Sequence, residues 1–251
     1  MDNLLYLKSG TDIRGTAIEK EGKDIDLTDT RLSTITASYV NFLKCKLGKD
    51  NLKITVGYDS RVSSERISRV VTRTLADLGV KVYDCGLSST PSMFMSIINF
   101  EVDSAVMITA SHLPMEMNGL KFFTRQGGFS GNDIKEILSY AEKNEYQLKN
   151  ETQKAEKLDN MKKYCKELCD MIKEGVNAPN YDRPLENLKI VVDAGNGVGA
   201  FYAEKVLAVL GADISGSCYL EPDGRFPNHI PNPENKQAMQ SICDAVKKAN
   251  A

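Results

Sequence analysis

The sequence predicts an α/β fold in which a mixed, mostly parallel sheet is sandwiched by helices. Short apolar runs that end at turn residues alternate with longer segments of helical period along most of the chain. This alternation is typical of parallel strands joined by helical crossovers. With 251 residues, of which 41% are hydrophobic, the chain can also bury a large core.

Charge and hydropathy exclude several classes of protein. The 32 basic residues nearly balance the 34 acidic ones, so no global field attracts nucleic acid or an anionic membrane. No apolar run approaches the roughly 18 residues that cross a bilayer, and the N-terminus lacks the features of a signal peptide. We therefore expect a soluble, cytoplasmic protein with neither nucleic-acid nor membrane partners, whose oligomeric state the sequence leaves open.

The first clear elements are a helix, a strand and a second helix. An apolar stripe over Asp29–Leu47, stopped by Gly48, predicts the first helix. The apolar run Lys53–Tyr58 predicts a strand, and we expect Ser63 or Ser64 to cap the helix that follows.

Two more parallel strands are predicted, over residues 80–85 and 104–109. Between them, Thr90 is the expected cap of a helix that has Pro91 in its first turn. The carboxyl ends of parallel strands meet at one edge of a sheet, so the loops that follow these strands are available to a ligand.

After residue 109 the pattern changes. A polar loop over 110–119 precedes a strand over 120–123, a turn at Gly127–Gly128 and a helix. We expect this helix to close a first domain that comprises residues 1–150. The expected inward-facing positions of the helix are Ile134, Ile137, Leu138 and Ala141.

The remainder of the chain is expected to form a connecting helix and linker over 151–184 and a second domain over 185–251. Only two strands are predicted in this second domain, which are too few for an independently stable sheet, so we expect it to be incomplete. Its expected elements are a strand over 189–193, a helix ending near Leu210, a strand over 212–217 and a helix capped by Asn232 with Pro233 in its first turn.

The strongest chemical signal is the segment T-A-S-H-L-P-M-E-M-N-G-L-K over residues 109–121. It places Ser111 directly beyond a strand, His112 beside it and Lys121 further along the chain. A serine without an adjacent base is a poor nucleophile, which favours a phosphoserine over an acyl-enzyme. A phosphoserine carries a charge of about −1.5 to −2 and requires a metal or cationic partners, of which Lys121 is the nearest along the chain.

This segment resembles the active-serine loop of the alpha-D-phosphohexomutases, the phosphomannomutase and phosphoglucomutase family, whose pattern reads T-A-S-H-N-P-x-x-x-N-G-x-K. Leu113 stands where the family usually has Asn. Further segments resemble the family in the same order, and the first of them is one residue shorter than usual. They are G-T-D-I-R-G at 10–15, G-Y-D-S-R at 57–61, V-D-A-G-N-G at 192–197 and D-G-R-F-P-N-H at 223–229.

The resemblance implies two phosphohexomutase-type domains and a mutase reaction. Phosphorylated Ser111 would donate its phosphoryl group to a hexose phosphate, and the resulting hexose 1,6-bisphosphate would turn around and return the other phosphate. The net result is the interconversion of a hexose 1-phosphate and a hexose 6-phosphate. Lys121 would transfer a proton or stabilise charge, Arg14 would neutralise phosphate oxygens and His112 would position the seryl phosphate or the sugar.

The resemblance also implies the ligands. Thr11, Arg14, Asn118 and Lys121 would bind substrate, and Mg²⁺ would be held by the phosphate of Ser111 together with residues beyond Ala251. The Asp-rich metal loop of the family has no match in this sequence. We therefore expect the N-terminal part of a larger enzyme, with little mutase activity and weak magnesium affinity of its own, and the choice among mannose, glucose and glucosamine phosphates stays open.

Alternatives remain. A non-catalytic phosphosugar-binding module is one, and a nucleotide-binding module is another, because Gly195-x-Gly197-x-x-Ala200 follows a strand as a dinucleotide fingerprint would. The fingerprint lacks a well-placed acidic residue, so we favour a tight turn. Some of the candidate residues could instead have purely structural roles. These are Arg14 as a solvated residue, Lys121 as an edge-strand residue, His229 as a structural loop residue, and Cys165 with Cys169 as packing residues rather than metal ligands.

Overall fold

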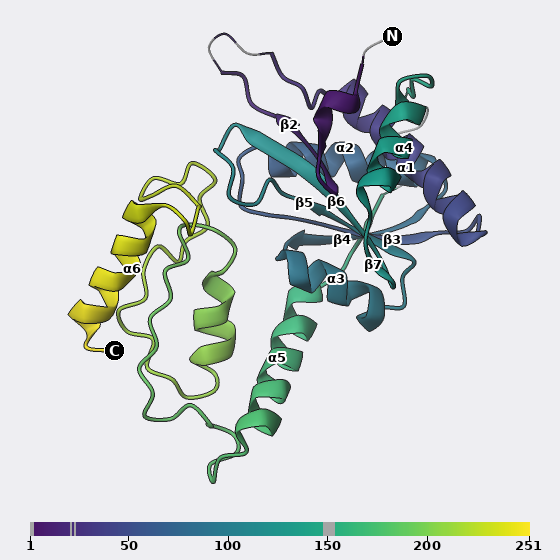
Figure 1. Cartoon of the computed structure of the whole chain (residues 1–251). Helices are drawn as coiled ribbons and strands as arrows, with labels where there is room; N and C mark the ends of the chain where they lie inside the picture. The colour runs from purple at the N-terminus through teal and green to yellow at the C-terminus, as the bar shows by residue number, and fades with distance from the viewer. Residues whose placement is uncertain (1–2, 21, 23, 148–153) are drawn as a thin grey trace. The chain divides into compact units, whose positions relative to one another are not determined.

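The computed structural model describes residues 3–147 and 154–251 except residues 21 and 23 (Figure 1). By its internal contacts the chain divides into two compact units. Unit 1 comprises Met1–Ala110 and Glu116–Asp159, and unit 2 comprises Ser111–Met115 and Asn160–Ala251. The predicted domain boundary at residues 150 and 151 lies outside the described residues.

Unit 1 is built on one mixed sheet, in the order β1-β2-β6-β5-β3-β4-β8, with β7 paired to β6. The β5, β3, β4 and β8 strands run parallel, whereas the pairs β1–β2, β2–β6, β6–β5 and β6–β7 are antiparallel. The strands are β1 Lys8–Ser9, β2 Asp12–Thr16, β3 Lys53–Tyr58, β4 Lys81–Leu87, β5 Ser104–Ile108, β6 Met117–Thr124, β7 Gly127–Gly128 and β8 Glu156–Lys157.

Helices cover both faces of this sheet, as Figure 1 shows, so the predicted mixed α/β fold is confirmed. Side chains of β5 alternate between two cores. Val106 and Ile108 pack in the core that the first, second and fourth helices share, whereas Ala105 and Met107 pack in the core beneath the third. The helices are α1 Asp29–Leu47, α2 Ser64–Asp77, α3 Thr90–Asn99 and α4 Gly131–Ala141, and a 3₁₀ turn, η1, spans Leu5–Leu7.

The ends of several elements differ from the prediction. Ser63 precedes α2 but makes no side-chain cap bond, because its hydroxyl accepts a hydrogen bond from Asn118 instead. Ser89 rather than Thr90 caps α3, through a reciprocal capping box with Ser92. Gly127–Gly128 is a short strand and not a turn, since it pairs with β6.

Unit 2 contains α5 Asn160–Val176, a π-helical turn η2 over Tyr202–Leu207 and α6 Lys236–Ala249. In place of the two predicted strands, the structure has two isolated parallel bridges, Lys189↔Asp213 and Asp193↔Cys218. The segments therefore run side by side in the predicted direction without forming a continuous ladder.

The start of α6 also differs from the prediction. Asn235 rather than Asn232 caps this helix, since its side chain accepts hydrogen bonds from the backbone of Gln237 and Ala238. Asn232 forms a local turn by accepting from the backbone of Glu234.

The helices were predicted to lie outside any membrane. None of those in the described ranges combines the length and the apolar character that a bilayer span requires.

Candidate active site

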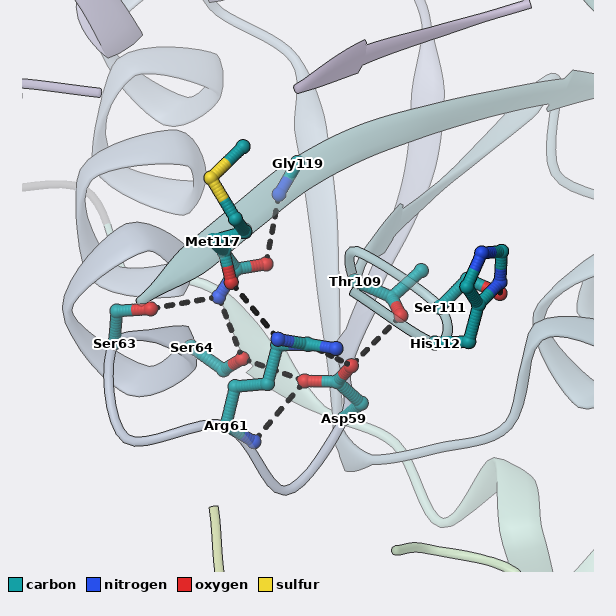
Figure 2. Close-up of polar contacts among 10 residues, drawn as sticks. Asp59, Arg61, Ser63, Ser64, Thr109, Ser111, His112, Met117 and Gly119 are labelled. Atoms are coloured by element: carbon teal, nitrogen blue, oxygen red, sulfur yellow. Dashed lines mark hydrogen bonds and ion pairs between the residues drawn. The ribbon is translucent and has the colours of Figure 1, made fainter. Parts of the chain in front are cut away.

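Two parallel strands of unit 1 are fastened together where they end. Asp59 follows β3 and Thr109 follows β5. The hydroxyl of Thr109 donates to Oδ2 of Asp59 over 2.7 Å (Figure 2). The backbone N–H of Asp59 donates to the carbonyl of Ile108 over 3.0 Å. The residue two positions before Ser111 is therefore anchored to the neighbouring strand.

Arg61 extends this anchor to β6. Its side chain is fully buried, and its Nε donates to Asp59 over 3.2 Å while one terminal nitrogen donates to the carbonyl of Met117 over 3.0 Å (Figure 2). Burial lowers the pKa of the Arg61 guanidinium, Asp59 opposes that shift, and the nearby charge of Arg14 adds to it. A guanidinium remains protonated at neutral pH, so Arg61 is a buried cation that is paired with Asp59.

Asn118 lies inside the same network. Its amide nitrogen donates to the hydroxyls of Ser63 and Ser64 over 2.9 and 3.0 Å, and its amide oxygen accepts from the backbone of Gly119 over 2.8 Å. Ser64 in turn donates to Asp59 over 2.8 Å. Asn118 is 0% exposed, and its hydrogen bonds connect β6 to the start of α2; its role in substrate binding stays a prediction.

The segment Ser111–Met115 carries the predicted nucleophile. Ser111 is exposed, and its φ angle of 58° places it in the left-handed region. That conformation costs a serine about 1 to 2 kcal/mol. Its Oγ lies 3.5 Å from Nδ1 of His112, which is the outer limit of a hydrogen bond. Figure 2 shows both side chains on the loop that follows Thr109.

The predicted cations Arg14 and Lys121 meet at one carboxylate. Oδ2 of Asp12 accepts from Nε and Nη2 of Arg14 over 3.2 and 2.7 Å and from Nζ of Lys121 over 2.6 Å. The side chains of Asp12, Arg14 and Lys121 are 7%, 15% and 21% exposed. This cluster, the Asp12 cluster, joins residues that lie more than a hundred positions apart, and Thr11 lies beside it, with its hydroxyl 3.5 Å from Oδ1 of Asp12.

Strand register explains why these residues meet. The antiparallel pairs Ile13↔Leu120 and Arg14↔Gly119 place Asp12 opposite Lys121. Alternate residues of a strand share a face, so Asp12 and Arg14 point to the same side as Lys121. No role was predicted for Asp12, Asp59 or Arg61, although all three stand within the motifs. The alternation of Asp12 and Arg14 along the chain was the signal that could have indicated a shared face.

Gly119 provides the space for Arg14. A Cβ atom at this position would lie 2.4 Å from the carbonyl oxygen of Ile13, 2.9 Å from Cγ of Arg14 and 3.0 Å from the carbonyl oxygen of Thr109. Two of these neighbours are backbone atoms, which cannot move aside easily. Only glycine therefore fits opposite Arg14.

The described residues include no group of three or more histidine, cysteine, aspartate or glutamate side chains that could hold a metal. Cys165 and Cys169 are buried free thiols on α5, in agreement with packing. Cys45 on α1 and Cys243 on α6 are exposed free thiols. The side chains present thus do not fit a complete magnesium site.

The ring of His229 fills the space beside the glycine turn of unit 2. Gly195 has a φ of 52°, and a Cβ there would lie 2.9 Å from Cε1 of His229. Nε2 of His229 lies 3.0 Å from Asp193, whose carboxylate also accepts from the backbone of Gly195 and from Ser241. This arrangement supports the structural interpretation of both the glycines and His229.

Comparison with protein families matches both parts of the chain. Residues 7–148 match the model of phosphoglucomutase/phosphomannomutase alpha/beta/alpha domain I, and residues 162–251 match that of domain II. The chain belongs to the phosphoglucomutase/phosphomannomutase family.

Curated members of the family are similar over much of the chain. A phosphomannomutase from Escherichia coli is 32% identical over 96% of this chain and 50% of its own length. A phosphoglucomutase from Neisseria gonorrhoeae is 31% identical over 79% of this chain and 41% of its own length. The chain therefore spans about half the length of the curated relatives it matches.

Solved structures share the fold. A phosphoglucomutase/phosphomannomutase family protein from Burkholderia thailandensis superposes with a TM-score of 0.79 at 24% identity, over 100% of this chain and 52% of that one. Parafusin, a phosphoglucomutase from Paramecium, superposes with a TM-score of 0.69 at 18% identity, over 93% of this chain and 46% of that one.

Proposed function

We propose that this chain is the serine-bearing part of a hexose-phosphate mutase that uses a phosphoserine and a hexose 1,6-bisphosphate. The observation that carries the proposal is the Asp12 cluster, in which two cations predicted to contact phosphate come together from β2 and β6. The names of the relatives, phosphomannomutase and phosphoglucomutase, support mannose or glucose phosphates as the substrate class.

The proposed reaction has two balanced phosphoryl transfers. A hydroxyl oxygen of the hexose phosphate attacks the phosphorus of phosphorylated Ser111, the bond from phosphorus to Oγ breaks, and the hydroxyl proton passes to a base. The bisphosphate then reorients, Oγ of Ser111 attacks its other phosphorus, and the bond from that phosphorus to the sugar oxygen breaks. The base returns the proton to this sugar oxygen. The sugar leaves with its phosphate on the other carbon, and the serine is phosphorylated again.

The chain's residues would supply positioning and charge compensation. The transition state of phosphoryl transfer spreads negative charge over the equatorial oxygens, which cations stabilise. We assign that role to Arg14 and Lys121, with Lys121 also as the proton-transfer group, and we assign Thr11 and His112 to the positioning of phosphate or sugar. Asn118 is assigned to the support of the loop, because its amide is buried and hydrogen-bonded.

None of the proposed steps of the reaction depends on magnesium. When bound, it would neutralise phosphate charge in such a site. The oxygens of phosphorylated Ser111 are the ligands we propose from this chain, and the described side chains do not complete a metal site.

The test is phosphorylation of the 251-residue chain by hexose 1,6-bisphosphate, followed by intact and peptide mass analysis. We expect one phosphoryl group, located on Ser111, because its exposed hydroxyl is the proposed acceptor. Ser111→Ala should remove it, and Ser215→Ala, which alters another exposed serine, should not. A coupled assay of hexose-phosphate interconversion should detect little turnover.

Each contrary outcome has a clear meaning. Equal phosphorylation of the Ser111→Ala variant would refute the nucleophile assignment. Tight binding of the bisphosphate with no transfer to Ser111 would favour the non-catalytic phosphosugar-binding module. Robust turnover would contradict the expected low activity of this chain.

A further inference from the structure

We infer that Asp12 is a positioning residue that fixes the guanidinium of Arg14 and the ammonium of Lys121 before any ligand arrives. The inference rests on the proposed function and concerns the same site. It begins from the single oxygen, Oδ2, that accepts from both cations at 2.7 and 2.6 Å. Charge-assisted bonds of this length are the strong ones in proteins.

The charge balance distinguishes this cluster from a structural ion pair. A structural pair would be neutral, whereas here two cations share one carboxylate, so one positive charge is left in excess. Both cations remain partly exposed, at 15% and 21%, whereas the carboxylate is 7% exposed. An arriving phosphate would therefore meet the cations and not the carboxylate.

Geometry favours positioning over simple neutralisation. The guanidinium is planar, and its Nε and Nη2 edge faces Asp12, so the direction of the remaining terminal nitrogen is fixed. The stem of Arg14 lies against Gly119, where no Cβ fits. Lys121 has a long flexible stem, and its bond to the same oxygen holds its ammonium next to the guanidinium despite their like charges.

The two possible roles of Asp12 predict opposite changes in anion affinity when its carboxylate is removed. If Asp12 were only a counterion, Asp12→Asn would change the net charge from −2 towards the positive and would tighten the binding of an anion. If Asp12 positions the cations, the same change lets them separate and weakens the binding of a hexose bisphosphate by about tenfold.

The experiment combines a measurement without ligand and a measurement with it. Exchange of the Nε proton of Arg14 is measured by NMR in the wild-type chain, in Asp12→Asn, in Asp12→Glu and in Asp103→Asn. Asp103 accepts hydrogen bonds from Lys49 and from the backbone of Lys53, so its variant removes the same charge elsewhere. Affinity for hexose 1,6-bisphosphate is measured by calorimetry on the same four proteins.

We expect Nε proton exchange about tenfold faster in Asp12→Asn, partial rescue in Asp12→Glu and wild-type values in Asp103→Asn. Unchanged exchange in Asp12→Asn, or tighter bisphosphate binding by that variant, overturns the role of Asp12 and leaves the proposed function standing. A wild-type chain that binds no bisphosphate contradicts the proposed function, and the exchange measurement alone then decides the role of Asp12.

Discussion

Ser111 occupies a backbone conformation that suits glycine better than serine. With φ at 58° its Cβ is strained against the backbone. Residues in such conformations persist where the surrounding structure holds them, and they cluster at functional sites. Just upstream, Thr109 bonds to Asp59 through its side chain and to Gly119 through its backbone N–H, which anchors the start of this loop.

This strain leads to a prediction about stability. Ser111→Gly should raise the free energy of unfolding by about 1 kcal/mol, because glycine adopts this φ freely and the relief exceeds its greater entropy in the unfolded chain. Ser111→Ala keeps the Cβ and should change stability by less than about 0.5 kcal/mol. Denaturant unfolding followed by circular dichroism measures both, and an alanine variant as stable as the glycine variant would contradict the strain.

At the scale of elements, the pairing of β2 with β6 builds the Asp12 cluster. The register places a glycine opposite an arginine and an aspartate opposite a lysine. The two strands are distant in sequence, and their antiparallel pairing is outside the parallel part of the sheet. The site therefore depends on how closely these two backbones approach.

Gly119→Ala tests that dependence. We expect a loss of about 1 to 3 kcal/mol in unfolding free energy, since the added Cβ would lie 2.4 Å from the carbonyl oxygen of Ile13. Gly128→Ala is the matched control, because its Cβ would meet only the ring of Phe123 at 3.8 Å. Thermal or chemical unfolding compares the two, and equal effects would show that Gly119 is not sterically required.

At the scale of the whole molecule, unit 2 has a pH-sensitive contact. His229 lies between two acceptors, with Nδ1 3.0 Å from the carbonyl of Ile230 and Nε2 3.0 Å from Asp193. Both contacts require a proton on the ring nitrogen, which favours the charged form. Burial disfavours the charge, but the bonds to Ile230 and Asp193 outweigh it and raise the pKa of His229 above 6.5.

The raised pKa of His229 makes the stability of this contact depend on pH. The contribution of His229 to stability should be complete below pH 6.5 and should be lost as the pH rises through the raised pKa of the folded state. The other groups at this contact are Tyr219, whose ring packs edge-on against His229, and Ser241 and Cys218, which adjoin Asp193. Burial raises the pKa of Cys218 to about 11, so its thiol stays neutral in this range.

The measurement is hydrogen exchange of residues 219–235 between pH 6 and 9, corrected for the intrinsic pH dependence of exchange. Wild-type protection should fall as the pH rises, whereas His229→Gln should lose about 1 to 2 kcal/mol at the acidic end and show a flat profile. The chain has two histidines, so His112→Asn is a natural control that should keep the wild-type slope. A wild-type profile without slope would exclude a protonated His229.

The sequence predicted those parts of the fold that local signals determine. The bounds of α1 and β3 are as predicted, and Gly48 ends α1 in a left-handed conformation. The four inward positions of α4 are all buried. Strand register and side-chain partners are long-range properties, so the sequence did not indicate that Asp12 joins Arg14 to Lys121 or that Asn118 is buried. In unit 2 the strand pattern was present, but only isolated bridges form.

The two exposed cysteines provide an experimental opportunity. Cys45 lies on α1 of unit 1 and Cys243 on α6 of unit 2, whereas Cys85, Cys165 and Cys169 are buried. Cys218 of unit 2 is partly exposed and would first be replaced by serine; a thiol-reactive fluorophore pair could then be attached at Cys45 and Cys243, one site on each unit. Energy transfer between the dyes would follow the separation of the units in solution and its response to a sugar bisphosphate.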